Sequence, residues 1–199
     1  MLRRMYGDIV PVPQERVLVA DVERGKGFPL RLGARALEFI DVKGHAKHHY
    51  AIWDTQSRGW FSGDTFGVSY RALDQDGHAY IMPTTTPIDF DPEAWALSLD
   101  RLMAPEPAYM YLTHYGRVDK VSTLARELRQ GLGEYVRIAT EAANHADRHA
   151  FLKTQLMAFH LQQLHERDLR LPDERLRELI SPDVEINAQG LGVWLDRQA

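Results

Sequence analysis

The stretch GHAKHH at residues 44–49 is followed along the chain by FSGDT at residues 61–65 and by LTHYG at residues 112–116. An apolar run precedes each stretch, so each one places polar side chains in a loop at the end of an expected strand. The first histidine of GHAKHH, the aspartate of FSGDT and the histidine of LTHYG thus place two imidazoles and a carboxylate at the three loop ends. Nitrogen and oxygen donors suit zinc or a similar divalent ion, and a carboxylate can bridge two ions that jointly activate a water molecule. The pattern therefore predicts a metal site.

The order of the motifs, GHAxHH, then SGDT, then THYG, resembles the second half of the metallo-β-lactamase-fold hydrolases. The resemblance covers roughly residues 6–116. It implies an α+β fold, namely the C-terminal half of an αββα metallo-β-lactamase-type sandwich. It further implies that His45 binds a first metal ion, that Asp64 bridges two ions and is catalytic, and that His114 binds the second ion.

The chain departs from the family pattern in two places. The family commonly has Pro-Gly before the first histidine, where this chain has Lys43-Gly44, and the upstream HxHxDH motif, which supplies four of the usual ligands, is absent. The first ion would keep His45 and Asp64, and the second would keep Asp64 and His114, whereas a catalytic zinc normally has three protein ligands. We therefore expect one or two ions of zinc or another divalent metal, held weakly.

Four further histidines are weaker candidates. His48 and His49 follow the first expected ligand, and we expect one to pack against or donate to a neighbour while the other faces solvent; a role beside the ligands or toward the substrate is more plausible than direct metal binding. His145 and His149 are spaced for one helix face, but the sequence between them, Ala-Asp-Arg, is typical of a solvated surface.

The composition limits the partners. The chain has 199 residues, of which 44% are hydrophobic and 26% charged, so it is predicted to be soluble and globular. A formal charge of -4 without a basic cluster argues against nucleic acid. The chain has no cysteine, so any metal must use His, Asp or Glu. Neither a signal peptide nor a membrane span is evident, which favours a cytoplasmic protein.

Local patterns predict two regions, a partial metallo-β-lactamase-like domain over residues 1–116 and a helical region over residues 117–199. The first region should contain a helix that begins after Asp91 and a loop-rich stretch over residues 67–87 that covers a site entrance. Its strands are expected at residues 16–22, 36–42, 50–53, 59–62 and 108–112. In the second region, helices are expected over residues 118–143 and 145–168, with shorter ones starting near residues 172 and 182.

The resemblance implies a metal-dependent hydrolase in which metal-activated water attacks an ester, thioester, lactone or phosphodiester of an unspecified small molecule. With two protein ligands for each ion, we expect this chain to be a poor catalyst, and a truncation or a fragment of a longer protein would explain the missing motif. The alternative is a non-catalytic interaction or dimerisation protein that retains the half-domain. A half sandwich leaves one sheet face uncovered, so we expect a homo-oligomer.

Overall fold

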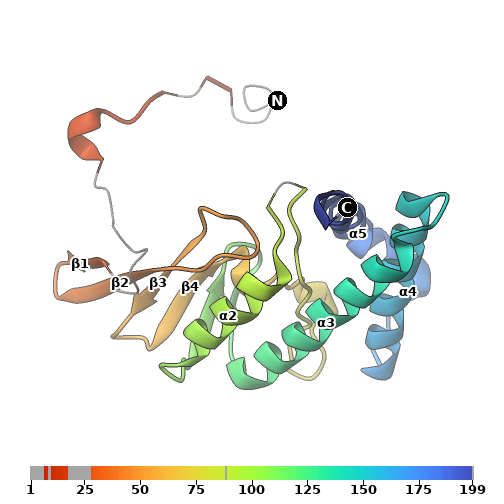
Figure 1. Cartoon of the computed structure of the whole chain (residues 1–199). Helices are drawn as coiled ribbons and strands as arrows, with labels where there is room; N and C mark the ends of the chain where they lie inside the picture. Colours follow the sequence, from red (N-terminus) through yellow and green to blue (C-terminus); the bar gives the residue numbers. More distant parts are fainter. Residues whose placement is uncertain (1–6, 9, 18–27, 88, 199) are drawn as a thin grey trace.

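The structure is a computed structural model that describes residues 7–8, 10–17, 28–87 and 89–198. Its α+β architecture combines one six-stranded sheet with four α-helices (Figure 1). Neighbouring strands are antiparallel except for β4 and β5, which are parallel. The strands lie in chain order, β1 (Phe28–Leu32), β2 (Arg35–Asp41), β3 (Tyr50–Asp54), β4 (Gly59–Gly63), β5 (Tyr109–Leu112) and β6 (Gly116–Val118).

The predicted strands at residues 36–42, 50–53, 59–62 and 108–112 are confirmed as β2, β3, β4 and β5. The strand expected at residues 16–22 lies mostly outside the described residues, and Arg16 itself belongs to a 3-10 turn, η1 (Gln14–Arg16). Two strands were not predicted. β1 contains Pro29, which a sheet tolerates at an edge, and β6 has only three residues, too few for a readable alternation.

Helix α2 (Pro92–Met103) makes the crossover that the parallel β4–β5 pair requires. The side chain of Asp91 caps its start by accepting a hydrogen bond from the Ala94 N–H over 3.0 Å, as predicted. Trp95 of α2 is fully buried, and the Trp60 indole N–H on β4 donates to the Leu102 carbonyl over 2.8 Å. Figure 1 shows that α2 runs across one face of the sheet, with α3 beside it.

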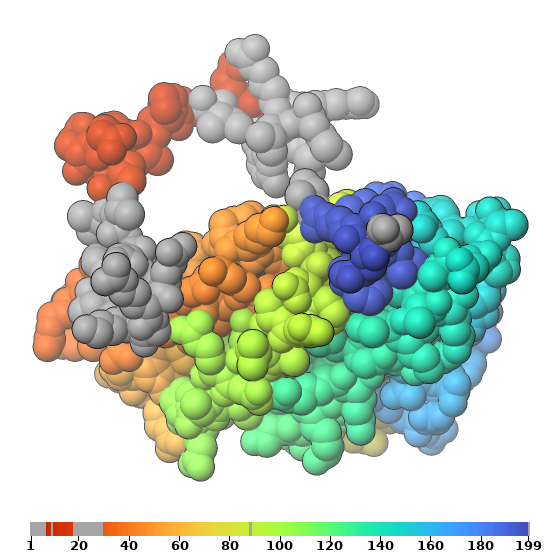
Figure 2. Space-filling model, in the orientation of Figure 1, coloured from red at the N-terminus to blue at the C-terminus, as the bar shows by residue number. Residues whose placement is uncertain are grey.

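The remainder of the chain is helical. Its helices are α3 (Val121–Ala142), α4 (Arg148–Glu166) and α5 (Asp173–Gln198), and in the described part no strand follows β6, as the helical periodicity predicts. In the space-filling view these helices form one continuous body beside the sheet and α2 (Figure 2). Among the described helices, none is long and apolar enough to cross a membrane.

The prediction of two short final helices is wrong, because α5 is one continuous helix with Pro182 inside it. A proline removes one intrahelical hydrogen bond and crowds the preceding turn. Here the helix continues because buried side chains on both sides of the proline, Ile180 and Val184, keep the same face against the core. Tertiary packing thus outweighs the local stop signal.

One cluster of buried apolar side chains joins the sheet to the helical region. It includes Met110 on β5, Leu128 on α3, Leu156 on α4 and Leu191 on α5. The domain boundary expected near residue 117 falls inside β6. The sheet and the helices therefore share their core.

Helices cover one face of the sheet and leave the other open. Ala51, Trp60 and Met110 point to the helix side and are buried. On the opposite face the register aligns Ile52, Phe61 and Tyr111 in a row across β3, β4 and β5, and the Phe61 and Tyr111 rings stack 4.8 Å apart. Phe61 is 43% exposed, so this face presents apolar surface to solvent.

Candidate metal centre

The three predicted ligands lie in loops at one edge of the sheet because of strand direction. β2, β4 and β5 run the same way, since β2 and β4 are both antiparallel to β3 and β5 is parallel to β4. His45 follows the end of β2, Asp64 follows β4, and His114 follows β5. The carboxyl ends of co-directional strands meet at the same edge, as in other sheets that carry binding groups there.

The Asp64 carboxylate lies between the two imidazoles. The Nε2 atom of His45 is 3.4 Å from Asp64 Oδ2, and the Nε2 atom of His114 is 3.5 Å from Asp64 Oδ1. Two ligand atoms that each lie about 2.0–2.1 Å from one tetrahedral zinc are about 3.3–3.4 Å apart. Each histidine–carboxylate pair thus has the spacing of two ligands on a common ion, and the predicted convergence of the three residues is confirmed.

One further observation concerns the fit of an ion. Among the described residues, none forms a hydrogen bond with the buried Oδ1 atom of Asp64, although His114 Nε2 lies 3.5 Å from it. An unpartnered buried carboxylate oxygen is unusual and requires a compensating group. In the part of the chain that the structure describes, however, no three His, Asp or Glu side chains form a group able to hold one ion. The donors therefore fit a divalent ion in chemistry and pair spacing, with two protein ligands for each ion.

Two threonines of the loop over residues 67–87 fix the orientation of His45. Its Nδ1 atom is 2.6 Å from the Thr84 carbonyl oxygen, and the Thr86 hydroxyl donates to the His45 carbonyl over 2.8 Å. A carbonyl only accepts, so Nδ1 carries a proton, and Nε2 is the ring nitrogen that faces Asp64 and could bind an ion. The loop predicted over residues 67–87 thus contacts a candidate ligand directly. The sequence predicted a loop but not this contact.

His49 and His48 differ, as the sequence predicted. The backbone N–H of Asp64 donates to His49 Nε2 over 2.8 Å, whereas the side chain of His48 is exposed. Burial, and next the nearby His45, lower the pKa of His49. The two histidines line a cavity of about 330 Å³ together with Tyr50 and Phe61 of the open sheet face.

Two glycines let the backbone approach the centre closely. Gly63 has a φ of 55°, and a Cβ there would lie 2.1 Å from His49 Nε2. Gly44 has a φ of 121°, and its Cβ would lie 2.3 Å from the Trp95 Cα. L-residues rarely adopt such positive φ values. The family departure at Lys43 therefore leaves the essential glycine in place.

The helical region adds a carboxylate near this edge that sequence reasoning did not identify. The Tyr70 hydroxyl donates to the carboxylate of Asp183 on α5, and the Tyr70 ring lies 4.4 Å from the Tyr115 ring, beside His114. Burial raises the pKa of Asp183, and Tyr70 and His114 partly offset that effect. Nothing in the sequence marks Asp183 as a residue near the centre, because Ser-Pro-Asp at residues 181–183 is typical of a helix start.

His145 and His149 do not combine into a site. His149 contacts Glu185 over 3.1 Å, while the His145 ring packs against Phe151 at 4.7 Å. Glu185 also pairs with Lys153 over 2.6 Å, and hydrogen bonds from Lys153 and Gln189 lower its pKa to about 2. His149 thus lies on a charged helix surface, as the sequence indicates, whereas His145 precedes α4, so the two histidines do not share a helix face.

Comparison with known proteins identifies the fold. A solved archaeal metallo-beta-lactamase superfamily protein from Sulfolobus tokodaii is 24% identical with a TM-score of 0.50, over 65% of this chain and 45% of its own. A metallo-beta-lactamase from Pontibacter korlensis is 19% identical (TM-score 0.41, 66% and 53% coverage), and a metallo-beta-lactamase family protein from Thermus thermophilus is 18% identical (TM-score 0.47, 87% and 48%).

The chain spans about half the length of these solved structures. A comparison with curated proteins finds no match. The sequence model of the metallo-beta-lactamase superfamily matches residues 3–114, which is more than half of the 199 residues. With the fold and the loop geometry, this match shows that the chain belongs to the metallo-beta-lactamase superfamily.

Proposed function

We propose that His45, Asp64 and His114 bind zinc or another divalent metal ion, and that the chain is a hydrolase by descent. The observation that carries the proposal is the position of Asp64, whose two carboxylate oxygens face different imidazoles at 3.4 Å and 3.5 Å. A bridging carboxylate in a two-ion site needs this division of its oxygens. The superfamily usually binds divalent metals, which supports the same assignment.

A bound divalent ion would supply Lewis acidity and an activated water for attack on an ester, thioester, lactone or phosphodiester. The side chains of the chain would hold and orient the ion. His45 is buried and held by Thr84, whereas the His114 side chain is 55% exposed, so the centre opens to solvent on the His114 side. A small-molecule substrate would enter there. With two protein ligands for each ion, we expect weak affinity and slow turnover.

Metal content tests the proposal. The purified chain is loaded with Zn²⁺, dialysed and analysed for metal, next to Asp64→Asn, which keeps the shape and removes the charge. Asp100→Asn is the matched control, because Asp100 is an exposed aspartate on α2 that pairs with Arg129. We expect one or two ions in the wild type and in Asp100→Asn, and none in Asp64→Asn. Equal metal in all three proteins would overturn the assignment.

Turnover tests the catalytic part separately. We expect ester and phosphodiester reporters to be hydrolysed below the common enzymatic range of about 1–10³ s⁻¹ with added Zn²⁺ or Mn²⁺. Rates within that range that disappear in Asp64→Ala would contradict the expectation of weak catalysis, while supporting the metal site.

A second candidate function is association of two copies through the open sheet face. Tyr50 and Phe61 on this face are 53% and 43% exposed, next to Ile52 and Tyr111. Contiguous apolar patches of this kind mark interaction sites. We favour a second copy as the partner, because an identical sheet face offers the same apolar row and the same twist for face-to-face packing.

Light scattering across a concentration series tests the second candidate. We expect a dimer that Phe61→Glu dissociates. Leu97→Glu is the control, since Leu97 is 67% exposed on α2, away from this face. A wild-type protein that stays monomeric at high concentration, or a dimer that persists in Phe61→Glu, would contradict association through this sheet face.

A further inference from the structure

We propose that Asn187 of α5 is a positioning residue for His45 and that it acts through the loop of residues 83–86. The helical region would thereby hold a candidate metal ligand in its binding tautomer. The effect on metal affinity rests on the proposed function, whereas the effect on the His45 imidazole does not.

The first link joins His45 to the 83–86 loop. The Thr84 carbonyl accepts from His45 Nδ1 over 2.6 Å, and the Thr86 hydroxyl donates to the His45 carbonyl over 2.8 Å. The same Thr86 hydroxyl accepts from the Asp89 N–H over 3.1 Å, which ties the far end of the loop. Both the backbone and the ring of His45 are therefore set by where this loop lies.

The second link joins the loop to Asn187. The amide oxygen of Asn187 accepts from the Thr85 N–H over 2.6 Å, and its amide nitrogen donates to the Pro83 carbonyl over 3.2 Å. The Thr85 hydroxyl also donates to the Asn187 backbone carbonyl over 3.2 Å. Asn187 is 1% exposed, so water does not replace these bonds easily. One side chain thus holds the residues on both sides of Thr84.

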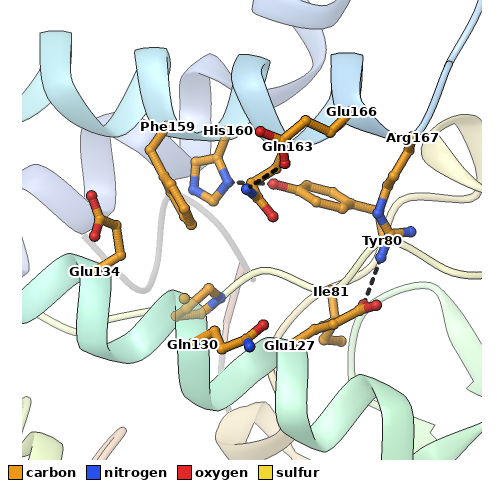
Figure 3. A pocket seen from close by; sticks show the side chains of 12 residues that line it. Tyr80, Ile81, Glu127, Gln130, Glu134, Phe159, His160, Gln163, Glu166 and Arg167 are labelled. Atoms are coloured by element: carbon orange, nitrogen blue, oxygen red, sulfur yellow. Dashed lines mark hydrogen bonds and ion pairs between the residues drawn. The ribbon is translucent and has the colours of Figure 1, made fainter.

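The third link fixes Asn187 itself. Its amide nitrogen donates to the Tyr135 hydroxyl over 3.0 Å, and that hydroxyl lies 2.7 Å from His160 Nε2. His160 Nδ1 lies 2.7 Å from the Tyr80 hydroxyl. Figure 3 shows His160 and Tyr80 turned toward each other at a cavity of about 460 Å³. The Asn187 amide therefore belongs to a buried network that leaves it little freedom to rotate.

Gly190 gives independent support. A Cβ at this position would lie 2.2 Å from the Thr85 Oγ1 and 2.9 Å from the Thr86 carbonyl oxygen. α5 approaches the loop this closely only because residue 190 lacks a side chain. At Gly192, two residues further along α5, a Cβ would have no atom of the described residues within 4 Å. The chain thus offers two glycines on one helix, of which only Gly190 touches the loop.

The consequence for His45 follows from its two nitrogens. With Nδ1–H donated to Thr84, Nε2 is the ring nitrogen that faces Asp64. If the loop shifted away, the Nδ1–H group of His45 would lose its acceptor, and the ring could rotate or change tautomer. Partners that orient a ligand histidine typically change metal affinity by about 10–100-fold when they are lost.

The test compares Gly190→Ala with Gly192→Ala, since both substitutions favour helix equally and only the first reaches the loop. Asn187→Ala and Tyr135→Phe form a second pair of graded strength. Asn187→Ala removes both amide bonds to the loop, whereas Tyr135→Phe keeps them and removes only the hydroxyl that holds the amide and donates to the Pro83 carbonyl over 3.4 Å. The readouts are the imidazole ¹⁵N shifts of His45 without metal at pH 8, and the affinity for Co²⁺ with its visible absorption spectrum. Circular dichroism checks that each variant is folded.

We expect the Nδ1–H tautomer in the wild type and Gly192→Ala, a partial loss of that pattern in Tyr135→Phe, and a full loss in Gly190→Ala and Asn187→Ala. Co²⁺ affinity should fall about 10-fold or more in the latter two. Folded Gly190→Ala and Asn187→Ala proteins with unchanged His45 shifts would overturn the inference. If the wild type does not bind Co²⁺, the proposed metal-binding function is wrong. The ¹⁵N shifts of His45 would then still decide whether Asn187 positions His45. If Asn187→Ala does not fold, the glycine pair decides alone.

Discussion

The backbone N–H of Asp64 donates a hydrogen bond to the Nε2 atom of His49 over 2.8 Å. This bond occupies the His49 lone pair, so His49 cannot ligate an ion through Nε2 while it holds. It also requires a neutral acceptor nitrogen, which agrees with the lowered pKa that burial gives His49. His49 thus supports the backbone at the point where Asp64 enters the centre.

His49→Ala should weaken Zn²⁺ binding by about 10-fold, because the Asp64 N–H loses its acceptor and the carboxylate loses its fixed position. His48→Ala, one residue away and exposed, should leave the affinity unchanged. Competition with a chromogenic chelator measures both. Equal effects of the two substitutions would show that His49 does not support Asp64.

Gly63→Ala should disrupt the same contact from the other side. The new Cβ would lie 2.1 Å from His49 Nε2, so the imidazole must move and release the Asp64 N–H. Gly33→Ala is the control, because Gly33 has a similar φ of 61° but no atom of the described residues lies within 4 Å of the Cβ that it would gain. Both should lose roughly 1–3 kcal/mol from the positive φ, and only Gly63→Ala should also lose metal affinity. Chemical unfolding and metal titration separate the two effects.

Trp95→Phe should destabilise the fold and disturb the centre together. The Trp95 indole N–H donates to the Thr65 carbonyl over 2.6 Å, next to Asp64, and its loss leaves a buried carbonyl unpaired at about 1–3 kcal/mol. Trp60→Phe removes a comparable bond to Leu102, far along α2 from the centre. We expect similar unfolding free energies for the two variants, with reduced metal affinity in Trp95→Phe alone.

The sequence predicted the elements that have strong local signals. The caps and apolar runs located α2, α3, α4 and four of the six strands, and the resemblance placed His45, Asp64 and His114 in loops that do meet. These features depend on neighbours in the chain, on strand direction or on a motif. Their function as ligands stays a prediction.

What the sequence did not predict depends on contacts between distant residues. Thr85 and Asn187 are ordinary loop and helix residues until α5 packs beside the 83–86 loop, and only then does the Asn187 amide bind Thr85 and Pro83. Pro182 is a helix-start signal that the packing of Ile180 and Val184 overrides. Such features carry no pattern in the chain, because they depend on partners from elsewhere in the fold.

The last prediction concerns acid stability. Burial lowers the pKa of His160 to about 3, compared with about 6.5 in an unfolded chain. Between these values the unfolded state binds the proton and the folded state does not, so stability is full above about pH 6.5 and falls as the pH drops toward 3. The loss should be about 1.4 kcal/mol for each pH unit in this window.

His160→Gln tests the acid prediction, because glutamine keeps a donor and an acceptor for Tyr80 and Tyr135 but does not titrate. Urea unfolding at several pH values, with a chelator present to remove metal, should give a steeper decline below pH 6.5 for the wild type than for the variant. The other charged residues that line the same cavity are unchanged in the variant, so the comparison isolates residue 160; they are Glu127, Glu134, Glu166 and Arg167. Parallel curves would mean that His160 is protonated in the folded state or exposed to solvent, and the buried network around Tyr135 would then need another explanation.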